Sequence, residues 1–211
     1  MAAHYIECIM RQNPHGPYAL AGFSFGGMIA WEMAGQLRQM GREVKLVAMF
    51  DTNAYRSIAN DPFAMRLRKQ TAYYINNIIH ALKFTTGFKN TVVEKTKAIK
   101  RKLVKRYWML RHGNDQNHQG FFGYAFKIDK CNIEALKQYQ LKPQDVVLDV
   151  FKAQTRTYYV ADTESLGWKP LALKGLNVHN IPGEHNTIFK APNDTEFAAV
   201  LQKCLDRVNL G

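Results

Sequence analysis

The chain has 211 residues, 46% of them hydrophobic and 22% charged, which is ordinary for one globular domain with a core of its own. The absence of an apolar run near the roughly 18 residues of a membrane span excludes an integral membrane protein, and the N-terminus has no signal-peptide pattern. The net charge of +12 is concentrated in Arg66–Arg111, which holds 13 Lys or Arg residues and one acid, Glu94.

The first quarter of the chain reads as a βαβ unit. A helix over Ala2–Gln12 ends at the breaker cluster 13–17 and is followed by a strand over Tyr18–Gly22. A helix over Gly27–Met40 leads to the mostly apolar strand Val44–Phe50. The order strand, helix, strand predicts a parallel sheet and an α/β fold.

The rest of the chain predicts an insertion and then a return to the sheet. Residues from about 60 to 145 show no strand alternation; we expect helices within 67–82, within 92–110 and over Ile133–Gln140. Two strands and a final amphipathic helix follow, over Val146–Ala153, Leu176–Ile181 and Thr195–Val208, with a turn at Pro182–His185 before that helix. We therefore predict one domain, 1–211, with an insertion at about 60–145.

A G-x-S-x-G motif, Gly22-Phe23-Ser24-Phe25-Gly26, lies between the first predicted strand and its helix. A serine exposed at such a sharp turn needs small neighbours, so we expect a Cβ at either Gly22 or Gly26 to clash. The helix N-terminus behind the serine favours a developing oxyanion. The motif predicts a nucleophile at Ser24; the alternative is a plain glycine-rich turn.

A nucleophilic serine needs a base and an acid that orients the base. Asp51 directly follows the second predicted strand and His185 follows the last one, so both should lie at the sheet edge that carries Ser24. The order Ser, Asp, His is that of an α/β-hydrolase. Asp162 is the alternative acid, and Asp51 could instead cap a turn. The other histidines, each a weaker candidate base, are His4, His15, His80, His112, His118 and His179.

The three cysteines, Cys8, Cys131 and Cys204, are odd in number and have no metal-like or C-x-x-C spacing. They predict free thiols in a reducing compartment, no metal site, and a cytoplasmic protein.

Seven segments together resemble one family. They are Gly16-Pro17-Tyr18, the run from Gly22 to Gly27, Ala30-Trp31-Glu32-Met33-Ala34, Phe50-Asp51, Phe151-Lys152-Ala153, Gly167-Trp168-Lys169-Pro170-Leu171 and Pro182-Gly183-Glu184-His185. The chain resembles the thioesterase domains that release products from nonribosomal peptide and polyketide synthetases. The resemblance covers most of the chain outside residues 60–135.

The resemblance implies a mechanism and a partner. Ser24 would attack a thioester carried on the phosphopantetheine arm of a carrier protein, with His185 as base. Asp51, preferred to Asp162 in this family, would orient the imidazole, and the Phe25 N–H would donate to the oxyanion. An acyl-enzyme would then release an acid or a macrocycle, with no cofactor bound to the domain itself.

The resemblance also implies a departure, because family members have several strands before the nucleophile strand and only one helix precedes Tyr18 here. We therefore expect an N-terminally truncated domain whose nucleophile strand lies at an uncovered edge. Two other functions stay open: an inactive remnant or carrier-docking module, and a free-standing esterase or editing thioesterase.

The basic insertion occupies the place of the family's lid. Its charge fits a solvated helix face, a docking surface for an acidic carrier protein, or contact with a membrane surface. We do not predict nucleic-acid binding, because no recognition motif accompanies the charge.

Overall fold

The chain divides into two units, which are described separately: Met1–Asp61 with Gln140–Gly211, and Pro62–Tyr139. The computed structural model describes residues 1–54, 71, 75, 104, 107, 121–156 and 160–209. The helices expected within 67–82 and 92–110 lie outside these residues, except for four helical positions at 71, 75, 104 and 107. The insertion at about 60–145 and its role as a lid stay predictions.

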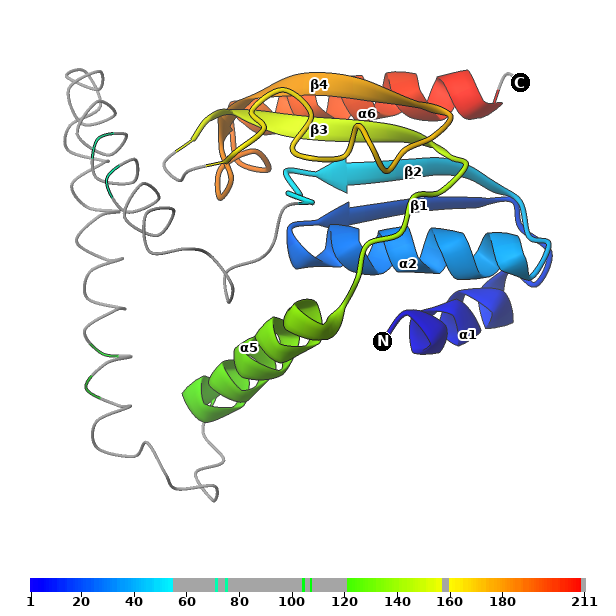
Figure 1. Ribbon diagram of the computed structural model, residues 1–211. Helices are drawn as coiled ribbons and strands as arrows, with labels where there is room; N and C mark the ends of the chain where they lie inside the picture. The colour runs from blue at the N-terminus through cyan, green and yellow to red at the C-terminus, as the bar shows by residue number, and fades with distance from the viewer. Residues whose placement is uncertain are drawn as a thin grey trace. The chain divides into compact units, whose positions relative to one another are not determined.

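A four-stranded parallel sheet forms the centre of the first unit (Figure 1). Its strands, in spatial as well as chain order, are β1 (Tyr18–Phe23), β2 (Val44–Phe50), β3 (Val147–Thr155) and β4 (Gly175–Glu184). All three strand pairs are parallel. The predicted α/β class and parallel sheet are confirmed.

Three helices accompany this sheet. They are α1 (Ala2–Gln12), α2 (Phe25–Gln39) and α6 (Asn193–Asn209). Helix α2 packs on β1 and β2 with α1 against it, whereas α6 packs on β2 and β4 (Figure 1). Along β2, Leu46 and Ala48 belong to the core beneath α6, and the alternation of side chains turns the buried Val47 and Met49 to the α2 face. The helices therefore cover opposite faces of the sheet.

The core beneath α6 is aliphatic and aromatic. Phe151, Ile181 and Phe197 are buried in it, and Phe23 and Phe50 pack at its margin. The apolar face predicted for the last helix is confirmed: Phe197, Val200, Leu201, Cys204 and Leu205 all pack in this cluster.

Several boundaries differ from the predicted ones. Helix α2 begins at Phe25, immediately after the turn residue, rather than at Gly27. Strand β4 continues through Pro182 to Glu184, although Pro182 was expected to end it. Within the described sheet β4 pairs with β3 alone, and edge strands are where a sheet tolerates proline.

The second unit contributes one long described helix, α5 (Phe121–Gln138). It begins 12 residues before the predicted start at Ile133 because no proline interrupts Phe121–Asn132. Of the described helices, none combines the length and apolar character that crossing a membrane requires.

Candidate active site

Ser24 lies in a strained turn between β1 and α2. Its backbone has φ 52° and ψ −115°, a conformation costing a non-glycine residue about 1–3 kcal/mol. Two hydrogen bonds hold it: the Ser24 N–H donates to the Phe50 carbonyl at 3.0 Å, and the Gly27 N–H donates to the Ser24 carbonyl at 3.2 Å. The strand-turn-helix context predicted for the motif is present.

The glycines around the serine have different roles from those predicted. A Cβ on Gly22 would overlap the backbone of Gly26 and Gly27, so the expectation for Gly22 is confirmed. The expectation for Gly26 is wrong, since a Cβ there meets nothing within 4 Å. The second essential glycine is Gly27, where a Cβ would overlap the Thr52 side chain. Space is therefore restricted on the β2 side of the turn.

Thr52 is a supporting residue that sequence reasoning missed. Its Oγ1 lies 3.0 Å from the Ser24 carbonyl, to which it donates, and the indole N–H of the buried Trp168 donates to its carbonyl at 2.7 Å. Thr52 thereby connects the serine turn to the loop after β3. Its place directly after Asp51 was the available clue.

Phe25 is the first residue of α2. The first N–H groups of a helix have no acceptor within the helix, and they carry its positive dipole end. This N–H directly follows Ser24 in the chain, and its role as the oxyanion donor stays a prediction.

Asp51 is buried at the end of β2, with its side chain fully inaccessible. Its own backbone has φ 46°, and its N–H donates to the Phe151 carbonyl at 2.7 Å. The Oδ1 atom accepts hydrogen bonds from the Ala153 N–H at 3.0 Å and from Arg156 Nη2 at 2.9 Å. The carboxylate is thus held from β3 as well as from its own strand.

The Asp51 carboxyl is ionised at neutral pH. Burial favours the neutral acid, but the hydrogen bond from His185, the Arg156 charge and the Ala153 N–H outweigh it and lower the pKa below its ordinary value. An ionised carboxylate can only accept, so the neighbouring imidazole nitrogen is the donor.

His185 lies in the turn that follows β4. Its Nδ1 donates to Asp51 Oδ2 at 2.8 Å, and its ring stacks on Phe23 with 4.5 Å between centroids. With Nδ1 protonated, Nε2 is the ring nitrogen that accepts a proton. Since Phe23 directly precedes Ser24, the stack places the imidazole beside the serine turn.

The turn itself is fixed locally. The Glu184 N–H donates to Thr187 Oγ1 at 2.8 Å, and Gly183 has φ 93° with no room for a Cβ beside Thr187 and Asn193. The three predicted residues thus follow the carboxyl ends of β1, β2 and β4, as expected for one sheet edge.

Asp162, the alternative acid, is used in a turn of its own. Its carboxylate accepts the N–H groups of Glu164, Ser165 and Gly167 at 2.9–3.0 Å, as well as the Ser165 hydroxyl. Burial raises the pKa of this carboxyl, but these hydrogen bonds lower it to about 2. In the structure the acid bonded to His185 is Asp51.

The alternative histidines have other surroundings. His179 on β4 pairs with the buried Asp149, and Cys204, the thiol beside them, has its pKa raised to about 11 by burial and by the Asp149 charge. A thiol with that pKa is protonated at neutral pH and is a poor nucleophile. His4 on α1 lies 4.0 Å from the exposed Cys8. His15 is exposed before β1; His80, His112 and His118 lie outside the described residues.

Arg156 was also missed by sequence reasoning. It follows β3 directly, and only 11% of its side chain is exposed while it pairs with Asp51. No motif marks it, and its position one residue beyond a strand end at the same sheet edge was the only available clue.

A family model described as "Thioesterase domain" matches residues 1–107, half of the chain. The chain belongs to the thioesterase domain family. Two relatives match nearly the whole of this chain. The inactive atromentin synthetase invA6 of Paxillus involutus is 24% identical over 98% of it, and the nonribosomal peptide synthetase atqA of Aspergillus terreus is 27% identical over 95% of it. This thioesterase chain spans 22% of each of those two proteins.

Solved structures agree with the fold. A four-domain nonribosomal peptide synthetase bound to AMP and glycine matches 96% of this thioesterase chain with a TM-score of 0.64 and 27% identity, over 15% of its own length. The NocB thioesterase domain, solved in covalent complex with a fluorophosphonate nocardicin G analogue, matches 97% of the chain, with 73% of that chain covered, a TM-score of 0.58 and 22% identity.

Proposed function

We propose that this chain is a serine thioesterase that works through an acyl-enzyme. The observation that supports it most is the hydrogen bond between His185 and the buried Asp51, beside the strained turn at Ser24. That pair supplies an oriented base with a fixed tautomer, which a hydroxyl nucleophile requires.

In the proposed reaction, Ser24 Oγ attacks the thioester carbonyl carbon while His185 Nε2 takes the hydroxyl proton. The C–S bond breaks, the proton passes from His185 to the leaving sulfur, and the acyl group stays on the serine oxygen. Water, or a nucleophile within the acyl chain, then attacks the ester with His185 again as base. The products are a thiol and either an acid or a macrocycle.

The Phe25 N–H is proposed to stabilise the oxyanion in both steps. Its position at the first residue of α2 combines an N–H donor with the positive end of the helix dipole. Loss of a single donor of this kind typically costs about 10²–10³ in rate.

The proposed substrate is an acyl or peptidyl thioester on a carrier-protein phosphopantetheine. The support is the family together with relatives that are named as nonribosomal peptide synthetases. The basic run Arg66–Arg111 is the proposed docking surface for an acidic carrier. Reversing Lys100, Arg101 and Lys105 to Glu should weaken carrier binding at low ionic strength; unchanged binding contradicts this docking role but leaves the proposed chemistry intact.

A fluorophosphonate probe tests the nucleophile directly. The purified chain should be labelled at Ser24, labelling should disappear in Ser24→Ala, and turnover of a thioester should fall by about 10⁶. Ser165→Ala is the matched control, because Ser165 is a buried serine that bonds Asp162, and it should label normally.

A folded chain that does not label would contradict the proposed activity. That result would favour the inactive alternative, which several relatives named as inactive atromentin synthetases make a concrete one.

A further inference from the structure

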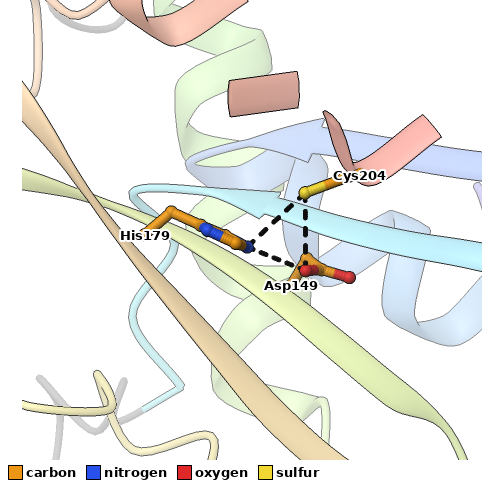
Figure 2. A group of neighbouring side chains, drawn as sticks. All are labelled: Asp149, His179 and Cys204. Carbon is orange, nitrogen blue, oxygen red and sulfur yellow. Dashed lines mark hydrogen bonds and ion pairs between the residues drawn. The ribbon is translucent and has the colours of Figure 1, made fainter. Parts of the chain in front are cut away.

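Three side chains of kinds that can coordinate a metal ion come together on the face of the sheet beneath α6 (Figure 2). Asp149 comes from β3, His179 from β4 and Cys204 from α6, and Asp149 and Cys204 are only 1% and 2% exposed. The His179 Nε2 atom lies 2.8 Å from Asp149 Oδ1 and 3.5 Å from Cys204 Sγ, and Sγ lies 3.6 Å from the same Oδ1. The three donor atoms thus form a small triangle.

The size of this triangle fits a metal ion. With the usual Zn–S, Zn–N and Zn–O bond lengths, a tetrahedral zinc separates sulfur from either light atom by about 3.6 Å, and nitrogen from oxygen by about 3.4 Å. The two sulfur edges already have those lengths. The remaining nitrogen–oxygen edge is shorter because a hydrogen bond joins the two atoms, and it would have to open by roughly 0.6 Å.

We propose that Asp149, His179 and Cys204 bind one Zn²⁺ ion through Oδ1, Nε2 and Sγ. A carboxylate, an imidazole and a thiolate are each ligands that zinc takes in proteins. Binding replaces the proton shared by His179 and Asp149 and the thiol proton of Cys204, and the fourth position is left for water.

The surroundings of Asp149 suit a ligand. Arg207 Nη2 lies 2.6 Å from the other carboxylate oxygen, Oδ2, and holds the carboxylate from that side. Oδ1 also accepts a hydrogen bond from Asn177 Nδ2 at 3.3 Å, which the ion would have to displace. The Arg207 charge opposes a cation, but the thiolate and the carboxylate together supply two negative charges. Hydrogen bonds to ligating carboxylates from outside the coordination sphere are common in metal sites.

Sequence spacing does not reveal this site, because each ligand comes from a different element. The predicted absence of a metal site depended on the spacing of cysteines alone. Asp149 and His179 are 30 residues apart, and Cys204 follows His179 by 25, so only strand pairing and the packing of α6 bring them together.

The proposed ion would cross-link α6 to the two strands under it. This site is separate from the one at Ser24, Asp51 and His185, because its ligands lie within strands and a helix and not in the loops at the carboxyl edge. Zinc should therefore raise the Tm of the chain without being needed for fluorophosphonate labelling.

Titration of the metal-free full chain with Co²⁺ tests the proposal. One equivalent should produce the thiolate-to-cobalt charge-transfer band and the visible bands of tetrahedral cobalt, and one equivalent of Zn²⁺ should abolish them. Cys204→Ser should remove the charge-transfer band, and His179→Gln should weaken Zn²⁺ binding about 100-fold or more.

Cys8→Ser is the matched control, because the exposed Cys8 with His4 on α1 is the other described thiol–imidazole pair. It should leave the band unchanged. The proposal is overturned if the wild-type chain shows no band, or if the band survives Cys204→Ser. The wild-type titration needs no variant, so the proposal can be contradicted even if a variant fails to fold.

Discussion

Asp51 and His185 are 134 residues apart in the sequence, yet 2.8 Å separates Oδ2 of the one from Nδ1 of the other. The parallel sheet produces this contact, because each residue follows the carboxyl end of a strand. The acid is fully buried while the imidazole is 25% exposed, so one partner is fixed by the protein and the other faces outward. A buried acid with a partly exposed imidazole suits a general base, which must be held in place and still be accessible to a substrate.

Replacing Asp51 by Asn should nearly abolish turnover while leaving the fold intact. An amide matches the carboxylate in size, but it cannot require Nδ1 to be the protonated nitrogen, so the imidazole adopts the wrong tautomer for a base. We expect kcat for a small thioester to fall by about 10⁴, the loss seen for this substitution in an established serine triad. Circular dichroism is the control for folding. A loss below tenfold would contradict the proposed role of Asp51.

Replacing Arg156 by Gln should lower kcat by about 10–100-fold and change KM little. Arg156 Nη2 donates to Asp51 Oδ1, and a hydrogen bond to a charged group contributes about 1.5–3 kcal/mol. Single-turnover hydrolysis measures the chemical step directly. Without Arg156, the pKa of Asp51 should rise toward its ordinary value.

Lys152→Gln is the matched control for Arg156. Lys152 is a cation on β3, the strand that Arg156 follows, and its Nζ donates to the Thr163 carbonyl at 2.8 Å. Removing it should leave kcat unchanged. Equal losses from the two substitutions would indicate a general effect of charge at the end of β3.

Much of this arrangement follows from local sequence. The run Val44–Phe50 is apolar enough to be buried on both faces, and a parallel strand order then puts Asp51 and His185 at the edge that carries Ser24. Arg156 and Thr52 have no such pattern. Their roles depend on hydrogen bonds of about 3 Å between residues that follow different strands. Hydrophobic periodicity predicts strands and helices, but it does not predict which side-chain atoms come into contact.

The edge position of β1 also agrees with the sequence-based expectation. Within the described sheet, β1 pairs only with β2. Ala19 and Ala21 are exposed on the face of the sheet that carries α6, because α6 packs on β2 and β4 and does not extend over β1. The proposed nucleophile is therefore supported from the β2 side, by the bonds from Ser24 to Phe50 and from Thr52 to Ser24.

Two alanine substitutions at neighbouring glycines should have opposite outcomes. Gly27→Ala places a Cβ in the space of the Thr52 side chain and should lower the free energy of unfolding by about 1–3 kcal/mol, the usual cost of overpacking. Gly26→Ala meets no neighbour and should leave stability unchanged or raise it by up to about 1 kcal/mol through better helix propensity. Urea unfolding of both variants measures the difference. Equal destabilisation would show that the turn tolerates no side chain at either position.

Asp162 should make the free energy of unfolding of the domain fall at low pH. Burial raises the pKa of its carboxyl, but the Ser165 hydroxyl and three backbone N–H groups lower it to about 2, below the ordinary value of 3.8. As the pH falls, the unfolded chain therefore takes up a proton on Asp162 at a higher pH than the folded chain does. The stability that the Asp162 carboxylate contributes is complete above about pH 4 and disappears as the pH falls through about 2.

Asp162→Asn tests the predicted loss of stability at low pH. At pH 7 it should lower the free energy of unfolding by about 1–2 kcal/mol, allowing for partial exposure of the group. In urea the gap between wild type and variant should narrow steadily from pH 4 to pH 2, because the wild-type carboxylate becomes protonated and loses the same bonds. A gap that stays constant over that range would show that the turn is held by shape and not by the carboxylate charge.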